Sequence, residues 1–88
     1  QPAPFQFLLL NDSLTVLEDR VLDLKLAING ESVPENVNVI LDGKELVMQR
    51  SDGLFGFGMQ PSTEGSIFYF EANGWKSAGW RVNRRKKV

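Results

Sequence analysis

Three aromatic side chains in the last third of the chain are the residues best suited to bind a ligand, namely Tyr69, Trp75 and Trp80. Exposed rings of this kind can stack on sugar faces or anchor a protein partner, because they offer a large contact area at little cost in rotamer entropy. Trp75 follows Asn73-Gly74, which places it in or beside a turn. In a small all-β domain, a tryptophan near the last strands more often fills the core or covers its end, so both interpretations stay open here.

A basic run near the end of the chain is the second candidate for binding: Arg84, Arg85, Lys86 and Lys87. Four adjacent charges would bind phosphates in a strongly salt-dependent way. Five of the ten Lys and Arg residues lie within residues 81–88, whereas all eleven Asp and Glu residues lie earlier, so residues 1–80 carry five positive and eleven negative charges, a net of −6. Such a body would repel nucleic acid. We expect a solvated linker, with an anionic membrane surface or an acidic partner as the alternatives.

Catalytic chemistry has few suitable side chains in this chain of 88 residues, which contains no His and no Cys. The composition excludes an imidazole base, a thiolate nucleophile and the common zinc and copper sites. A Ser or Thr nucleophile would need Lys25, Lys44, Lys76 or a carboxylate as its base, and none of these lies in a recognisable motif. The acidic turn residues Asp12 and Asp52 lie in no calcium-loop pattern. We therefore predict a domain that is not an enzyme and has no metal or cofactor.

Short strands are the elements that must position the candidate residues. Gly, Pro, Asn and Asp interrupt the chain repeatedly and leave apolar-rich segments of about five to eight residues. Asp42-Gly43 separates two such segments, and Asp52-Gly53 precedes a third. Both pairs predict two-residue hairpin turns, because a type I′ turn needs positive φ at both central residues.

The core is predicted from bulky residues that recur at every second position, since such residues share one face of a strand. We expect its centre to consist of four Phe and four aliphatic residues: Phe55, Phe57, Phe68, Phe70, Leu24, Leu26, Val39 and Leu41. Gly56 and Gly58 occupy the opposite face of the Phe55 strand. They are expected to leave room for another strand or a large side chain that crosses this outer face.

Residues 14–28 fit two kinds of secondary structure. A helix is favoured by apolar residues at helical spacing, by Ser13 as a candidate N-cap and by Gly30 at a C-terminal position. A strand is favoured because it places four apolar residues on one face: Leu22, Leu24, Leu26 and Ile28. The helix would instead expose Leu22 and Leu26 to water. We favour the strand, and the alternative is an α+β domain with a helix near residues 14–28.

About seven short strands with turn signals every 8 to 12 residues are typical of an immunoglobulin-like antiparallel β-sandwich, and this all-β fold is our prediction. The first strand should start at Phe5, break and continue at residues 14–17, as edge strands do when they switch sheets. Residues 1–4 are expected to be a linker, 5–83 the sandwich and 84–88 a basic tail or linker outside the sheet. Trp80 and Val82 should face the core. Deletion of residues 84–88 should then leave the melting temperature nearly unchanged.

A set of landmarks along the chain resembles a known family: Pro4-Phe5-Gln6-Phe7, Leu10-Asn11-Asp12-Ser13-Leu14-Thr15-Val16, Val33-Pro34, Val37-Asn38-Val39, Met48, Phe55, Phe68-Tyr69-Phe70-Glu71-Ala72-Asn73-Gly74 and Ser77. Together they look like an immunoglobulin-like domain found inside large uncharacterised Bacteroidetes envelope proteins, and the resemblance covers nearly the whole chain. It implies a non-catalytic spacer or protein-binding module of a larger bacterial envelope protein, either periplasmic or membrane-associated. The family supplies no catalytic residues to carry over.

The partners expected from these features are neighbouring domains of the same chain and a protein or a glycan, with no specific nucleic acid. Contact with a membrane would come only through the parent protein or the basic tail. The alternative function, based on the surface aromatics, is a carbohydrate-binding module that uses Tyr69, Trp75 and Trp80.

Overall fold

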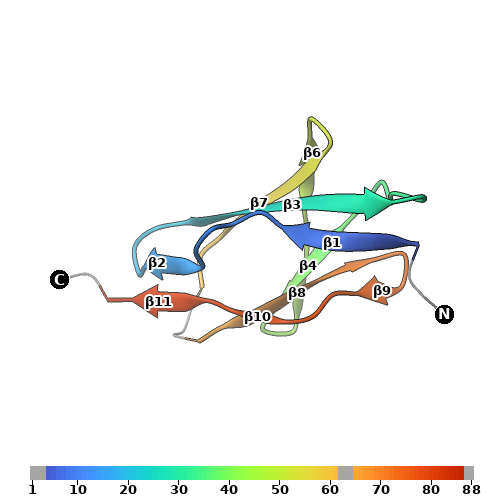
Figure 1. Ribbon diagram of the computed structural model, residues 1–88. Coiled ribbons are helices and arrows are strands. Elements are labelled where there is room, and N and C mark those ends of the chain that lie inside the picture. Colours follow the sequence, from blue (N-terminus) through green and yellow to red (C-terminus); the bar gives the residue numbers. More distant parts are fainter. Residues whose placement is uncertain (1–3, 62–64, 87–88) are drawn as a thin grey trace.

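The computed structural model describes residues 4–61 and 65–86 and contains two packed antiparallel sheets (Figure 1). The first sheet has four strands in the order β1 (Phe5–Leu9), β3 (Leu22–Gly30), β7 (Leu54–Met59) and β6 (Gln49–Ser51). The second has the order β10 (Trp80–Arg81), β8 (Ile67–Ala72), β4 (Asn38–Leu41) and β5 (Lys44–Val47), with β9 (Trp75–Lys76) also beside β8. The described residues include no helix, so the predicted all-β sandwich is confirmed.

The strand order is that of an immunoglobulin-like sandwich. When the strands are lettered along the chain, the two sheets contain A-B-E-D and G-F-C-C′, which is the arrangement of that fold. A third, small sheet consists of β2 (Thr15–Leu17) and β11 (Asn83–Arg85), which pair in parallel. The described residues form eleven strands rather than about seven, mainly because the first strand is divided into β1 and β2 and the last into β9, β10 and β11.

The first strand breaks after β1, as predicted, and the Asn11 side chain bridges the break. Its Nδ2 donates a hydrogen bond to the Asp23 carbonyl oxygen at 2.8 Å, and its Oδ1 accepts one from the Lys25 N–H at 2.8 Å. The side chain thereby pairs with the β3 backbone where a further residue of β1 would otherwise do so. After this break the chain leaves the first sheet and continues as β2, which pairs with β11.

The strand interpretation of residues 22–28 is confirmed, and no helix forms over residues 14–28. Leu22, Leu24 and Leu26 are all buried. Val21, which lies at helical spacing between Leu17 and Leu24, is exposed. Helical spacing was a weaker guide here because side-chain burial between two sheets stabilises the strand more than local propensity can stabilise a helix.

Both predicted Asp-Gly turns have the expected backbone conformation. The φ angles are 50° and 83° at Asp42-Gly43, between β4 and β5, and 52° and 78° at Asp52-Gly53, between β6 and β7. Asn73-Gly74 makes the same kind of turn between β8 and β9, with φ angles of 51° and 83°. These turns set the register of three antiparallel pairs.

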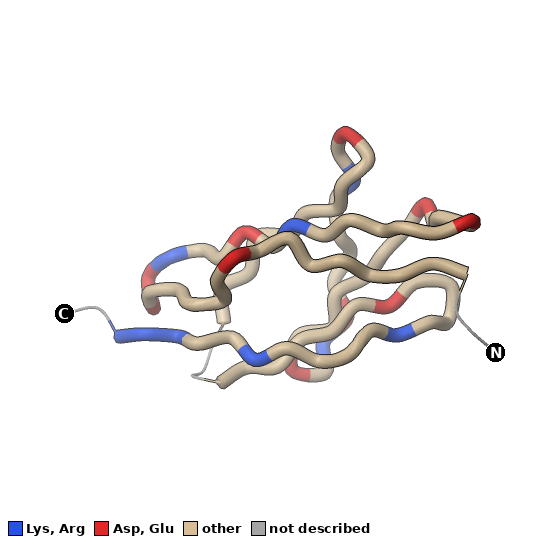
Figure 2. The backbone as a smooth tube through the Cα atoms, in the orientation of Figure 1, with Lys and Arg blue, Asp and Glu red and all other residues tan. Residues whose placement is uncertain are grey.

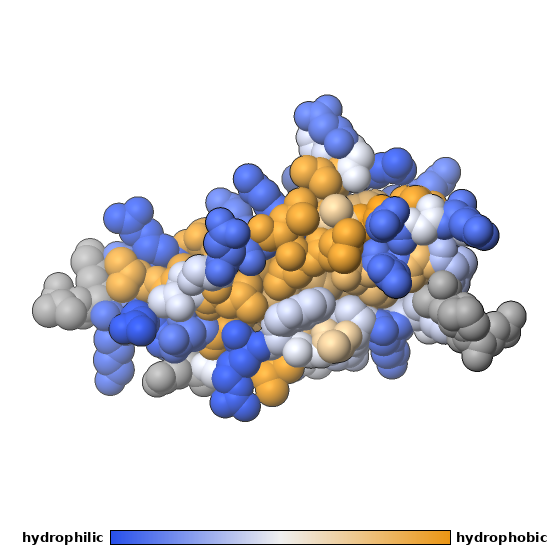
Figure 3. Space-filling model, viewed as in Figure 1, coloured by the Kyte–Doolittle hydropathy of each residue, from blue (hydrophilic) through white to orange (hydrophobic). Residues whose placement is uncertain are grey.

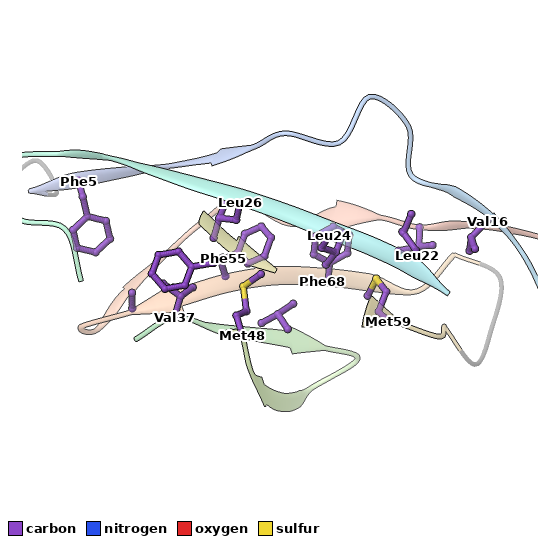
Figure 4. Packing of buried hydrophobic residues seen from close by; sticks show 14 residues of the cluster. Phe5, Val16, Leu22, Leu24, Leu26, Val37, Met48, Phe55, Met59 and Phe68 are labelled. Carbon is purple, nitrogen blue, oxygen red and sulfur yellow. The ribbon is translucent and has the colours of Figure 1, made fainter. Parts of the chain in front are cut away.

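The core lies between the two sheets and runs along the length of the molecule (Figure 4). Six of the eight predicted core residues are buried: Phe55, Phe68, Phe70, Leu24, Leu26 and Val39. Phe57 and Leu41 pack against the core but remain partly exposed, which corrects the prediction for these two. The Phe57 side chain is partly exposed because the pairing of β6 with β7 ends at Gly56, so no β6 residue lies beside Phe57. Leu41 is the last residue of β4 before its turn.

The outer face of β7 differs from expectation. No strand or large side chain crosses Gly56, since a Cβ atom there would meet only the Leu24 carbonyl oxygen, at 3.7 Å. Over Gly58, the Val21 side chain does come close, with its Cγ1 3.0 Å from the position of a Cβ. Gly56 therefore lies on open surface.

Gly30 ends β3 opposite Phe5 rather than capping a helix. A Cβ atom at Gly30 would lie 2.4 Å from both the Pro4 carbonyl oxygen and the Phe5 Cα, which are backbone atoms that cannot move without shifting β1. We predict that Gly30→Ala lowers the free energy of unfolding by roughly 1 to 3 kcal/mol, whereas Gly56→Ala, which adds its methyl group to open surface, changes it by less than about 1 kcal/mol. Urea denaturation of both variants tests this, and equal midpoints would contradict the close approach of β1 to Gly30.

Candidate functional site

Trp80 covers one side of the core, as the sequence predicted. It lies on β10 opposite Phe68, and its ring stacks on the Phe68 ring at 5.7 Å between centres. The Phe70 ring lies 5.5 Å away and is tilted against it. Val82, two residues further on, is fully buried. Alternation along a strand thus directs Trp80 and Val82 inward and Arg81 outward. The Trp80 ring contributes mainly to packing, and only part of it reaches the surface.

Trp75 and Tyr69 lie on opposite faces of the second sheet. Trp75 begins β9 opposite Ala72, whose side chain is buried, and it packs against the core. Tyr69 lies on the outer face, between the inward-facing Phe68 and Phe70, and the Lys76 Nζ is 6.0 Å from its ring centre. This distance is within the range of a cation–π contact. The three aromatic candidates therefore do not form one coplanar platform, because two face the core and one faces solvent.

The outer face around Tyr69 is mixed in character. Ile40 lies opposite Tyr69 and is buried, whereas Ile67, two residues before Tyr69, is exposed. Asn38 donates a hydrogen bond from Nδ2 to Glu45 Oε1 at 2.6 Å. Charged side chains share this face: Glu45, Glu71, Lys76 and Arg81. Val47, opposite Asn38, also points to this face and is exposed. The surface thus mixes charged and apolar side chains.

The prediction that residues from Arg84 onward lie outside the sheet is wrong for Arg84 and Arg85, which belong to β11. The Asn83 N–H donates to the Leu14 carbonyl oxygen at 2.9 Å, and the Glu18 N–H donates to the Arg85 carbonyl oxygen at 2.8 Å. These bonds satisfy backbone groups of both chain segments. Lys86 is exposed beyond the strand, and Lys87 lies outside the described residues.

Pairing in β11 separates the two arginine side chains. Arg84 lies opposite Val16, is partly buried and has its Nη2 3.9 Å from Glu18 Oε2. Its Nε is buried and makes no hydrogen bond within the described part of the chain. Arg85 is exposed on the other side of the strand. Figure 2 shows this basic segment near acidic positions of the same end of the molecule. Arg84 and Arg85 are thus not presented on one continuous face.

Three polar side chains have structural roles that sequence reasoning did not assign to them. Asn11 bridges the break described above. Arg50, on the edge strand β6, places its guanidinium 5.8 Å from the centre of the buried Phe55 ring and covers the edge of the core. Ser77 accepts a hydrogen bond from the Phe70 N–H at 2.8 Å and donates one to the Ala78 carbonyl oxygen at 2.9 Å, between β9 and β10. The partners of Asn11 lie 12 and 14 residues away in the chain. Those of Arg50 and Ser77 are closer in sequence, and they become partners through the turns between neighbouring strands.

A hollow of about 530 Å³ lies on the outer face of the first sheet. Its floor is formed by Gly56 and Gly58, which have no side chains. Asp23 and Lys25 on β3 form one wall, and the opposite wall comes from residues on and before β6: Val47, Gln49 and Ser51. The hollow is shallow, and it combines carboxylate, amine and amide groups on a backbone floor.

Within residues 4–61 and 65–86, no helix is long and apolar enough to cross a membrane. The same stretches contain no group of three or more acidic residues arranged to hold a metal ion. Comparison with known proteins found no matching family model, no matching curated protein and no matching solved structure.

Proposed function

We propose that this chain is a non-catalytic spacer or protein-binding module of a larger bacterial envelope protein. The observation that supports a spacer is the course of the chain, which enters through β1 at one end of the long axis and leaves through β11 at the other (Figure 1). The molecule measures 46 × 26 × 20 Å. Domains joined in this way would each add their length to a row. The envelope setting is supported by the resemblance of the sequence landmarks.

Both ends of the described chain are tied into sheets, which suits a spacer. β1 pairs along its whole length with β3, and β11 pairs with β2. Terminal segments are usually the least ordered parts of a domain unless they are tied down in this way. Neighbouring domains could therefore move without loosening the sandwich at either end.

A fusion of two copies, joined end to end through residues 88 and 1, tests the spacer proposal. We expect small-angle X-ray scattering to give a maximum dimension about twice the 46 Å length of one copy. A maximum dimension close to that of a single copy would mean that the two copies fold back on each other, and it would contradict the proposal. The single chain, measured in parallel, supplies the reference dimension.

The carbohydrate-binding alternative has less support because Trp75 and Trp80 pack against the core while Tyr69 lies on the opposite face of the sheet. Affinity electrophoresis with soluble polysaccharides separates the two functions. We expect no retardation of the domain in these gels. Retardation that is lost in Tyr69→Ala or Trp75→Ala, with the fold retained by circular dichroism, would replace the spacer with a carbohydrate-binding module.

A further inference from the structure

The outer face of the first sheet carries fewer charged side chains than the outer face of the second sheet. The residues that point outward from β1, β3, β7 and β6 are Gln6, Leu8, Asp23, Lys25, Ala27, Asn29, Leu54, Gly56, Gly58, Gln49 and Ser51. Only Asp23 and Lys25 among them carry a charge. The outer face of the second sheet, in contrast, carries Glu45, Glu71, Lys76 and Arg81.

Exposed apolar side chains gather on this outer face. Leu8 lies opposite Ala27, and the exposed fractions are 42% for Leu8, 47% for Leu10 and 39% for Leu54. Leu10 continues the same face one step beyond β1, since its N–H donates to the Lys25 carbonyl oxygen at 2.8 Å. Figure 3, which views the long edge of the sandwich, shows apolar surface along β1. Exposed apolar side chains that share one sheet face can take part in an interaction site.

The two charges on this face are arranged so that the face is complementary to itself. Asp23 and Lys25 are two residues apart on β3, which places them on the same side of the strand and about 7 Å apart. Neither takes part in a salt bridge among the described residues. Two copies can pack with these faces toward each other around a two-fold axis that runs between the faces, at right angles to β3 and level with Leu24. In this arrangement Asp23 of each copy lies opposite Lys25 of the other.

We propose that this sheet face binds a second copy of the chain, in a two-fold symmetric dimer with reciprocal Asp23–Lys25 ion pairs. Leu8 and Leu54 would lose contact with water in the dimer, and Gly56, which no side chain covers, would let the two backbones approach closely over β7. Charge complementarity selects a second copy rather than an unrelated partner, because one strand supplies both charges. The surface lies on the long side of the molecule, so the dimer does not depend on the end-to-end spacer role.

The dimer should be weak. Four strands spaced by about 4.8 Å and about six residues long span roughly 400 Å² per copy, which is below the usual size of a specific interface. The hollow and the projecting β6–β7 hairpin (Figure 1) leave only part of this area for contact. A dissociation constant on the order of 100 µM is expected, which makes association visible only at high protein concentration. Salt should weaken it further, because the ion pairs at its centre are screened.

Sedimentation velocity of the whole 88-residue chain, at concentrations up to about 1 mM, tests the proposal together with charge-reversed variants. Lys25→Asp and Asp23→Lys each place like charges opposite one another, so each should weaken dimerisation at least about tenfold. The double variant Asp23→Lys with Lys25→Asp restores the reciprocal pairs and should return the dissociation constant to within about threefold of the original. Glu45→Lys, on the outer face of the other sheet, is the matched control and should leave association unchanged.

Three results would overturn the dimer: a chain that stays monomeric at about 1 mM, unchanged association in Lys25→Asp, or a double variant as weak as the single ones. Circular dichroism of each variant verifies the fold, and these exposed positions are not expected to disturb it. A monomeric chain would leave the spacer proposal intact, because the end-to-end fusion measures a different property. A folded-back fusion with rescue by the double charge reversal would contradict the spacer and support the dimer.

Discussion

Replacement of Phe68 by alanine is expected to lower the free energy of unfolding by about 3 to 5 kcal/mol. Phe68 is completely buried, and its ring contacts both Phe70, at 5.6 Å between ring centres, and Trp80. Its removal leaves a cavity that the surrounding rings cannot fill by small movements. Because small domains have a total stability of about 5 to 15 kcal/mol, this single loss should be visible as a large fall in the urea midpoint.

Ile67→Ala provides the matched control for Phe68, since the two residues are adjacent on β8 but point to opposite faces. Ile67 is 47% exposed, so its truncation should cost less than about 1 kcal/mol. If Phe68→Ala does not fold, Phe68→Leu keeps part of the ring volume and should lose about 1 to 2 kcal/mol. Equal losses in Ile67→Ala and either Phe68 variant would mean that the inner and outer faces of β8 have been exchanged.

Deletion of residues 84–88 is expected to lower the melting temperature by roughly 10 to 20 °C, which reverses the expectation from sequence alone. The deletion removes most of β11, including the Arg85 carbonyl oxygen that accepts the Glu18 N–H. It also uncovers Val16, which is buried opposite Arg84. Lost backbone hydrogen bonds and apolar burial together should cost about 2 to 4 kcal/mol, less the entropy regained by the freed residues of β2.

Deletion of residues 86–88 alone is the control, because it removes positive charge and keeps β11 whole. Its melting temperature should fall by less than about 3 °C. Differential scanning calorimetry of both truncated chains separates the contribution of the strand from that of charge. If both truncated chains have the same melting temperature as the intact chain, β11 does not stabilise the domain and the basic segment is a tail.

Several features of the fold could be predicted from the sequence because adjacent residues determine them. The Asp42-Gly43 and Asp52-Gly53 turns follow from the residues that tolerate positive φ. The inward faces of β3 and β8 follow from alternation at a period of two, since the leucines of β3 share one face and the phenylalanines of β8 share one face. The absence of His and Cys, which removes the commonest catalytic and zinc-binding side chains, is likewise a property of the sequence alone.

The candidate surfaces, in contrast, were decided by which strands become neighbours. A basic segment such as Asn83–Arg85 has no hydrophobic signal, and it joins the fold through backbone bonds to β2, which lies far earlier in the chain. Trp80 faces inward because its register places it opposite Phe68, whereas Tyr69 faces outward. Asp23 and Lys25 stand alone on a low-charge face only because β1, β7 and β6 lie beside β3. Backbone pairing between distant strands leaves no local side-chain pattern, so only the tertiary structure could place these residues on common or opposite surfaces.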